Sequence, residues 1–173
     1  MKALNRLARR GAARRGTALI EFTLLGIPLL CVTTSVMSIG LDAWQYWSLA
    51  YATDATARYI SMHGATCSQN SNACTIKTGQ VAAFFESQSM ALSSSSVDVS
   101  LTDSSGTTNC NPVSSCASGL VTFPASSANS VGSDITVQAT YTLVNPIMMF
   151  WGNNHVSGNN YTVGAKSKVR IQF

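Results

Sequence analysis

The sequence predicts an α+β protein, in which one long amino-terminal helix precedes a small antiparallel sheet with disulfide-bonded loops. Three observations lead to this fold class. Residues 17–41 form an apolar run with one charge, residues 42–63 are rich in Ala and contain no Gly or Pro, and two late segments alternate between apolar and polar residues. Runs of the first two kinds indicate helix, whereas a period of two indicates strand. The 173 residues suffice for one ordinary domain but not for two large ones.

Charge is scarce and unevenly placed along the chain. Charged residues make up 10% of the sequence, against roughly 25% in a typical soluble protein, which disfavours an ordinary cytosolic enzyme. A basic amino terminus on an otherwise nearly neutral chain is typical of a targeting or orientation signal. A nucleic-acid-binding surface instead needs basic residues spread over a folded face. The first sixteen residues hold no acid and six basic residues, namely Lys2, Arg6, Arg9, Arg10, Arg14 and Arg15.

Residues 17–41 are predicted to cross a membrane once. As a helix this segment is about 37 Å long, which exceeds a bilayer core of about 30 Å. The basic flank before it is retained on the cytoplasmic side, so the chain beyond residue 41 is expected to lie outside the cytoplasm. A buried core helix is the alternative, and the length of the run and the arginines at its edge disfavour it. The expected location is therefore the cytoplasmic (inner) membrane.

Several export signals are weakly marked in this region. A signal peptidase site requires small residues before the cut, and this region offers Thr33, Ser35 and Ser38. A lipoprotein site would use Cys31, but a leucine stands before it where a small residue is expected. The arginine pair at 14–15 is weak evidence for folded export. None of these signals explains the acid at position 21.

Glu21 is the single charge in the apolar run. An ionised group in hydrocarbon costs roughly 2.5–3.5 kcal/mol on insertion scales, so an intramembrane acid is a functional hypothesis by default. It lies five residues after Gly16, within RRGTALIEF. This arrangement resembles the prepilin (type III) signal of type IV pilins and pseudopilins. With the Glu21–Phe22 pair, Pro28 and the helix beyond, it is similar to the TadE-like proteins of tight-adherence (Flp-type) pili.

The resemblance implies maturation by a prepilin peptidase, which cuts between Gly16 and Thr17. Residues 1–16 would be the leader, and the cut would create a new ammonium group at Thr17. Glu21 lies one helical turn away, so it could pair with the Thr17 amine of its own chain or of a neighbouring subunit and set the axial register. The alternative is a glutamate that snorkels to the headgroups near the helix end and is only tolerated there. The implied partners are other pilin or pseudopilin subunits, the Tad assembly machinery and membrane lipid.

Residues 42–63 are expected to extend the same helix out of the membrane. The aromatic residues that directly follow the apolar run, at positions 44, 46 and 47, suit a membrane interface. The segment ATDATARYI is similar to the stretch that follows the membrane segment in TadE-like proteins. An apolar-leaning stripe at steps of three and four predicts the packed face of this helix. Its members are Trp44, Trp47 or Ser48, Tyr51, Ala55, Tyr59 and Met62.

Four cysteines follow the apolar run and are expected to oxidise outside the cytoplasm. Short loops close most readily, which favours the pairs Cys67–Cys74 and Cys110–Cys116, although four cysteines allow three pairings that the sequence does not separate. A metal site is disfavoured because neither spacing is C-x2-C and neither histidine is placed with the cysteines. Cys31 lies inside the apolar run, out of reach of the others.

The outer domain, residues 64–173, is predicted to contain one further helix and a small sheet. Residues 78–92 form an amphipathic pattern that ends in a serine run. Period-two alternation predicts strands at 97–101, 135–143 and 161–171, each with one apolar face, which the outer half of the long helix would cover. Residues 103–130 are predicted to be loop, with a short strand possible at 120–123. The apolar run 147–151 either lies on the surface as a contact patch or packs under the domain.

The sequence contains no recognisable catalytic or cofactor motif. Nucleophile elbows, zinc-protease helices, phosphate loops and paired carboxylates are all missing from it. We therefore expect neither enzymatic activity nor a bound cofactor, metal or nucleic acid. The resemblance implies a minor pseudopilin of an adhesion pilus, because the major subunits of such pili are much shorter chains. The alternatives are an uncleaved, membrane-anchored binding module and a pseudopilin of a secretion or DNA-uptake system.

Overall fold

The computed structural model describes residues 2–64, 75–144 and 160–172, with the backbone alone described for residues 2–18, 144, 160 and 161. The predicted Cys67–Cys74 pair and the apolar run 147–151 lie outside these residues. The chain divides into two compact units, residues 1–40 and residues 41–173. Its architecture confirms the predicted α+β class, with a long amino-terminal apolar helix and a small antiparallel sheet.

The first element, α1, is an α-helix of 60 residues, Lys2–Ser61, with Pro28 inside it. The prediction placed helix at 17–63, so the helical backbone begins earlier than expected and ends two residues sooner. At the end of the helix the His63 ring donates a hydrogen bond from Nδ1 to the Tyr59 carbonyl oxygen, at 2.7 Å. Arg58 lies in the last turn, where a cation suits the negative end of the helix dipole.

The sheet has four antiparallel strands in the order β2-β1-β3-β4. Strands β1 (Val97–Asp103), β3 (Asp134–Val144) and β4 (Asn160–Arg170) confirm the three strands that the alternating pattern predicts. The fourth strand, β2 (Gly106–Cys110), lies within the segment that was predicted to be loop, so that prediction was wrong there. The possible strand at 120–123 is only an isolated bridge between Lys77 and Thr122.

The alternation of apolar and polar residues does not reveal β2, because Cys110 is the only residue of this strand that is buried. What makes this segment a strand is the hairpin turn that joins it to β1. The Asp103 carboxylate accepts hydrogen bonds from the backbone N–H groups of Ser105, at 2.8 Å, and Gly106, at 3.0 Å. It also accepts one from the Ala125 N–H at 2.9 Å, which joins the turn to a distant loop. Asp at the first position and Gly at the fourth suit such a turn.

The same hydrogen bonds predict a pH dependence of stability. Burial raises the pKa of Asp103, but the bonds from Ser105, Ala125 and Gly106 outweigh burial, so the pKa lies below 3.8. A lowered folded pKa means that the stabilisation is present above the unfolded value and is lost as the pH falls through the folded one. We expect Asp103→Asn to lower the free energy of unfolding at pH 7 by about 1–3 kcal/mol and to flatten its dependence on pH below about 4.

Urea titrations at several pH values, followed by circular dichroism, measure this effect. The control is Asp98→Asn on the same strand, because the Asp98 side chain has no hydrogen bond or ion pair within the described residues. Equal losses in both variants would contradict the role assigned to Asp103.

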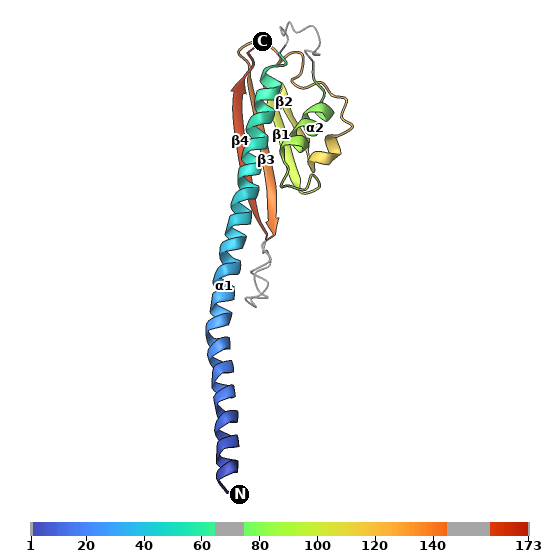
Figure 1. Cartoon of the computed structure of the whole chain (residues 1–173). Helices are drawn as coiled ribbons and strands as arrows, with labels where there is room; N and C mark the ends of the chain where they lie inside the picture. The colour runs from blue at the N-terminus through green and yellow to red at the C-terminus, as the bar shows by residue number, and fades with distance from the viewer. Residues whose placement is uncertain (1, 65–74, 145–159, 173) are drawn as a thin grey trace. The chain divides into compact units, whose positions relative to one another are not determined.

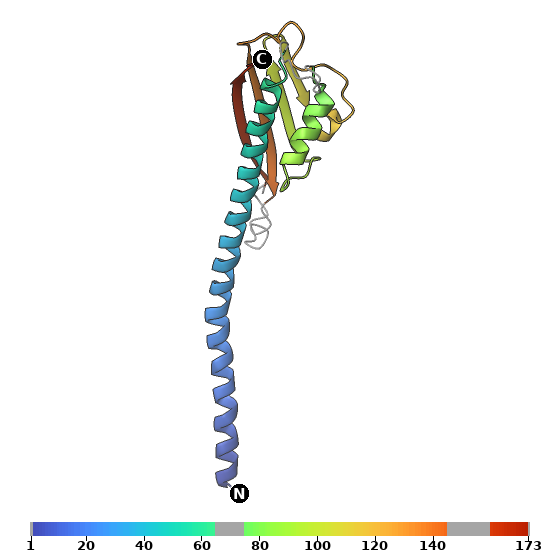
Figure 2. The ribbon, with the colours of Figure 1, turned by 45° about the horizontal axis from the view of Figure 1, so that its top comes forward.

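One face of the sheet is covered by two helices, as Figures 1 and 2 show. The part of α1 that belongs to the second unit lies along β3, and α2 (Thr78–Gln88) lies over β1 and β2. The two helices meet where the rings of Tyr59 and Phe84 stack, with centroids 4.3 Å apart. The sheet's buried residues come from alternate positions of the strands, among them Val97, Val99, Leu101, Ile135, Val137 and Ala139. The predicted cover of the sheet is thus confirmed, with α2 as a second part of it.

Helix α2 is shorter than the predicted 78–92 and ends at Gln88. At its start the Gln80 side chain accepts a hydrogen bond from the Lys77 N–H at 2.9 Å. At its end the Ser89 N–H bonds back to the Phe85 carbonyl, and the chain then turns. Val81 and Phe85 are buried as expected, while Phe84 and Leu92 are only half-buried.

The packed face of α1 differs from the predicted stripe, and this prediction was wrong. The residues buried against the sheet are mostly small or hydroxylated, because a helix can lie closer to a sheet when its facing side chains are short. Trp44, Trp47, Tyr51 and Met62 lie instead on exposed positions, and Tyr59 is half-buried. The face that is buried consists of Leu49, Ala52, Thr53, Thr56, Ala57 and Ile60. On the flank of this face, Asp54 accepts a hydrogen bond from the Ser167 hydroxyl of β4 at 3.1 Å.

For two buried threonines on this face, we expect replacement by valine to change the free energy of unfolding in opposite directions. The Thr53 hydroxyl donates to the Leu49 carbonyl at 2.7 Å, whereas the Thr56 hydroxyl has no hydrogen-bond partner among the described residues. A buried hydroxyl without a partner is destabilising, and valine has nearly the same shape without it. We expect Thr56→Val to raise the free energy of unfolding by about 1 kcal/mol, and Thr53→Val to lower it by about 0.5–1 kcal/mol. Matched urea titrations test the pair, and a loss of stability in Thr56→Val would contradict the assignment.

Candidate functional site

The amino-terminal part of α1 is the candidate site, because its composition sets it apart from the rest of the chain. Among the described residues, α1 is the one helix long and apolar enough to cross a membrane, judged by length and composition over Leu19–Ser61. Its large apolar side chains are exposed throughout, for example Leu25 at 72% and Ile39 at 69%. Within the described residues this segment thus does not show the burial of a core helix.

Four hydroxyl side chains in the apolar segment are hydrogen-bonded within the helix itself. The Thr23 hydroxyl donates to the Leu19 and Ile20 carbonyls, at 3.1 and 3.0 Å. The hydroxyls of Thr33, Thr34 and Ser35 donate in the same way to carbonyls three or four residues earlier. Such bonds satisfy the hydrogen-bonding capacity of the hydroxyl groups within the helix. A segment in lipid requires this because hydrocarbon offers no hydrogen-bond partners.

Glu21 differs from these hydroxyl groups. Its carboxylate is exposed and has no hydrogen bond or ion pair within the described residues. The adjacent Phe22 is 77% exposed, and its ring lies beside Gly26, one turn further along. Gly16 and Thr17, the predicted cleavage site, lie within the helical backbone of α1. The four residues predicted to form the cleavage site and to set the axial register thus lie in one helix. In it the Glu21 carboxylate, which has no partner among the described residues, lies one turn after Thr17.

Aromatic side chains directly follow the apolar segment, as predicted from the sequence. Trp44, Tyr46 and Trp47 are 42–68% exposed. The rings of Tyr46 and Trp47 meet edge to face, with centroids 6.0 Å apart. Exposed Trp and Tyr at the end of an apolar helix suit a membrane interface, where the ring is apolar and its N–H or O–H can reach water.

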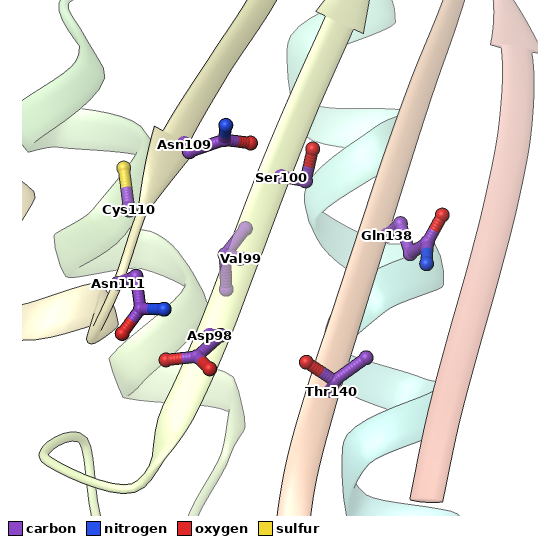
Figure 3. A pocket seen from close by; sticks show the side chains of 8 residues that line it. All are labelled: Asp98, Val99, Ser100, Asn109, Cys110, Asn111, Gln138 and Thr140. Carbon is purple, nitrogen blue, oxygen red and sulfur yellow. The ribbon is translucent and has the colours of Figure 1, made fainter.

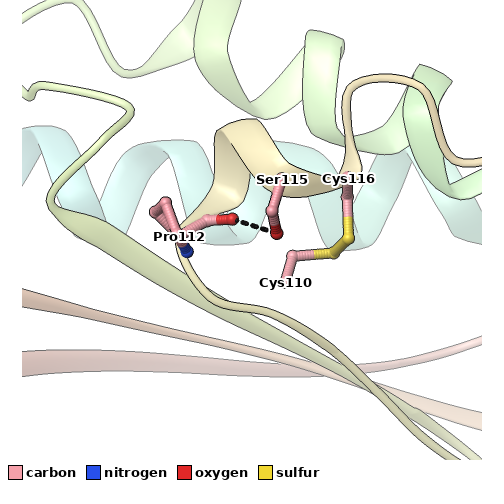
Figure 4. The surroundings of a disulfide bond; sticks show 4 residues. All are labelled: Cys110, Pro112, Ser115 and Cys116. Atoms are coloured by element: carbon pink, nitrogen blue, oxygen red, sulfur yellow. Dashed lines mark hydrogen bonds between the residues drawn. A yellow bond between two sulfur atoms is a disulfide. The ribbon is translucent and has the colours of Figure 1, made fainter.

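The predicted disulfide between Cys110 and Cys116 is confirmed, and Figure 4 shows its surroundings. The two Cα atoms are 5.5 Å apart. The bridge closes a short loop that contains a 3-10 helix, η1 (Val113–Cys116), where the Ser115 hydroxyl donates to the Pro112 carbonyl at 2.7 Å. Cys31 is the free cysteine among the described residues.

The described residues contain no arrangement that suggests catalysis or metal binding. No group of three or more His, Cys, Asp or Glu side chains comes together in residues 2–64, 75–144 and 160–172. His63 is bound to the Tyr59 carbonyl and packs on the Tyr59 ring, with centroids 4.4 Å apart. On the polar face of β4 the side chains of Lys168 and Arg170 are exposed, and both pair with Asp134, at 2.8 and 3.1 Å.

Sequence analysis missed one feature of the outer unit, a hollow on the polar face of the sheet. It is lined mainly by Ser, Thr, Asn, Gln and Asp side chains from β1, β2 and β3. Along each strand, the polar residues that alternate with apolar ones are expected to face solvent. Only the pairing of the strands, however, places these polar residues next to one another. Comparisons of the chain with protein-family models, with curated proteins and with solved structures found no match.

Proposed function

We propose that this chain is a TadE-like minor pseudopilin, a structural component or assembly primer of a tight-adherence pilus. It would be inserted once in the cytoplasmic membrane, with residues 42–173 outside the cytoplasm, and matured by prepilin peptidase after Gly16. The observation that carries the proposal is the course of α1, which continues without a break from an exposed apolar segment into the helix that covers an antiparallel sheet. A subunit of this design can hold its neighbours through the apolar helix and present the sheet domain outward.

The lone carboxylate of Glu21 supports the same proposal. Within the described residues nothing neutralises it, so its burial in lipid would be unfavourable in an isolated chain. Cleavage after Gly16 supplies an ammonium group one helical turn away. Pairing with that group in a neighbouring subunit would make the burial favourable only on assembly, which explains why an acid is kept in an otherwise apolar segment.

The proposal is tested by mass spectrometry of the natural chain, purified from membranes. A chain that begins at Thr17 is the expected result. An intact amino terminus would favour the alternative of an uncleaved, membrane-anchored binding module, and a cut after residue 31 would indicate ordinary signal processing. A pseudopilin of a secretion or DNA-uptake system shares the cleavage after Gly16. Recovery of the chain in sheared pili, rather than in membranes alone, separates the pilus role from that one.

Glu21→Gln is expected to be processed normally but to fail in assembly. The amide keeps the size of the side chain and removes the charge, so the Thr17 ammonium is left without a partner, which costs about 3–5 kcal/mol for a buried pair. Incorporation into sheared pili should then fall about a hundredfold or more, since 1.4 kcal/mol corresponds to one decade. The control is Glu86→Gln, the same change on α2. Wild-type incorporation of Glu21→Gln would remove the assembly role of the acid.

A further inference from the structure

Six polar side chains form two rows across the sheet on the face that points away from the helices. In the first row, Asp98 of β1 is the register partner of Thr140 of β3. Asn111 completes this row, because it follows Cys110, which pairs with Val99. The second row crosses β2, β1 and β3, and Figure 3 shows both rows. Its members are Asn109, Ser100 and Gln138, joined by the pairings of Ser100 with each of the others. We call these six side chains the polar array.

The polar array lines a hollow of about 170 Å³. This is smaller than the roughly 300–1,000 Å³ of a pocket for a drug-sized ligand, so it suits one small ring or the end of a chain. The first row is open at the side of β4, because the register partner of Thr140 there is Gly164, which has no side chain. A ligand longer than one ring could therefore continue across the sheet in that direction.

None of the six side chains makes a hydrogen bond or ion pair within the described residues. Some other polar groups on the same face do have partners within the described residues. The hydroxyls of Thr102 and Thr107, the next register pair along β1 and β2, bond to each other at 3.0 Å. Asp134 is paired with two basic side chains of β4. The polar array is thus a contiguous group of side chains whose hydrogen-bonding capacity is left to solvent or a ligand.

The chemistry of the array favours an uncharged ligand with many hydroxyl groups. Three amides can each donate and accept, two hydroxyls can do the same, and one carboxylate accepts two hydrogen bonds. Side chains on facing strands stand about 5 Å apart, and those two residues apart on one strand about 7 Å. That spread matches hydroxyls around a sugar ring. A cation instead needs six or more oxygens converging at about 2.3–2.6 Å, and Asp98 is the only charged member.

We propose that the polar array binds a neutral saccharide through vicinal hydroxyl groups. Asp98 and Asn111 lie opposite each other and would grip one pair of hydroxyls, while Asn109 and Gln138 would hold the groups on the other side of the ring. The backbone that carries the array is fixed before binding: Cys110, between the two asparagines, is buried and disulfide-bonded, and β1 is an inner strand of the sheet. Such preorganisation lowers the entropy lost on binding. The inference does not depend on cleavage of the leader or on assembly.

The test uses the full chain in lipid nanodiscs without glycolipid, labelled with ¹⁵N. The methyl pyranosides of mannose, galactose and glucose are titrated in, with tetrahydropyran as a ring that has no hydroxyls. We expect at least one glycoside to shift the side-chain NH₂ signals of Asn109, Asn111 and Gln138, and tetrahydropyran to leave them unchanged. Asn109→Ala and Gln138→Ala should each weaken binding about two- to tenfold, as expected for one lost hydrogen bond.

Lys166→Ala is the matched control, because Lys166 is the register partner of Gln138 on the same face but does not line the hollow. It should leave the affinity unchanged. Shifts with none of the three glycosides would overturn the proposal. Shifts with Ca²⁺ alone, abolished by Asp98→Asn, would also overturn it and identify a cation site, whereas saccharide binding should survive Asp98→Asn because the amide still bonds to hydroxyls.

Discussion

A chain that carries Gly16→Trp is expected to remain in the membrane at its full precursor length. The proposed peptidase must bring the backbone at the cut into its active site, and an indole on the residue before the scissile bond leaves no room for this approach. The effect should be nearly complete, because it acts on every molecule before assembly. Immunoblots of membrane fractions, together with the mass of the intact chain, measure the ratio of precursor to mature chain.

Gly11→Trp is the matched control for this substitution. It places the same indole in the same basic leader, five residues before position 16. Because it does not adjoin the cut, this variant should be processed like the wild type. Normal maturation of Gly16→Trp would contradict cleavage at this site, and a block in both variants would show only that the leader tolerates no bulky residue.

Gly119→Ala is expected to lower the free energy of unfolding by about 3 kcal/mol, at the upper end of what overpacking costs. The start of α2 lies directly on the loop that contains this glycine. The Gly79 N–H donates to the Gly119 carbonyl at 3.0 Å, and the Thr78 N–H donates to the Val121 carbonyl at 2.8 Å. These bonds satisfy donors at the helix start that would otherwise lack partners.

A methyl group at position 119 has no free space in this packing. It would overlap the Thr78 hydroxyl and come within 2.9 Å of the Cys116 carbonyl oxygen, so α2 or the disulfide loop must shift. The control is Gly106→Ala in β2, where an added methyl meets nothing within 4 Å. Urea titrations followed by near-ultraviolet circular dichroism compare the two. A loss below about 0.5 kcal/mol in Gly119→Ala, the range of ordinary surface changes, would contradict this account of the packing.

Much of the fold could be predicted because its signals are local. An apolar run long enough to cross a bilayer, a helix pattern from residue 78 and three alternating segments all report their own secondary structure. The Cys110–Cys116 pair could be favoured on loop length alone. The candidate site is local in the same way, since the spacing of Gly16, Thr17, Glu21 and Phe22 is a property of one helix.

The sequence by itself therefore determined the apolar helix, its lone acid and the strands with an apolar face. The tertiary structure alone decided which face of α1 packs, since the short side chains of Ala52, Thr56 and Ala57 let the helix approach the sheet while Trp47 and Tyr51 stay exposed. It also decided that Gly106–Cys110 is a strand and that the polar array comes together. The physical reason is that periodicity describes one segment, whereas these features arise from pairing and packing between segments that are distant along the chain.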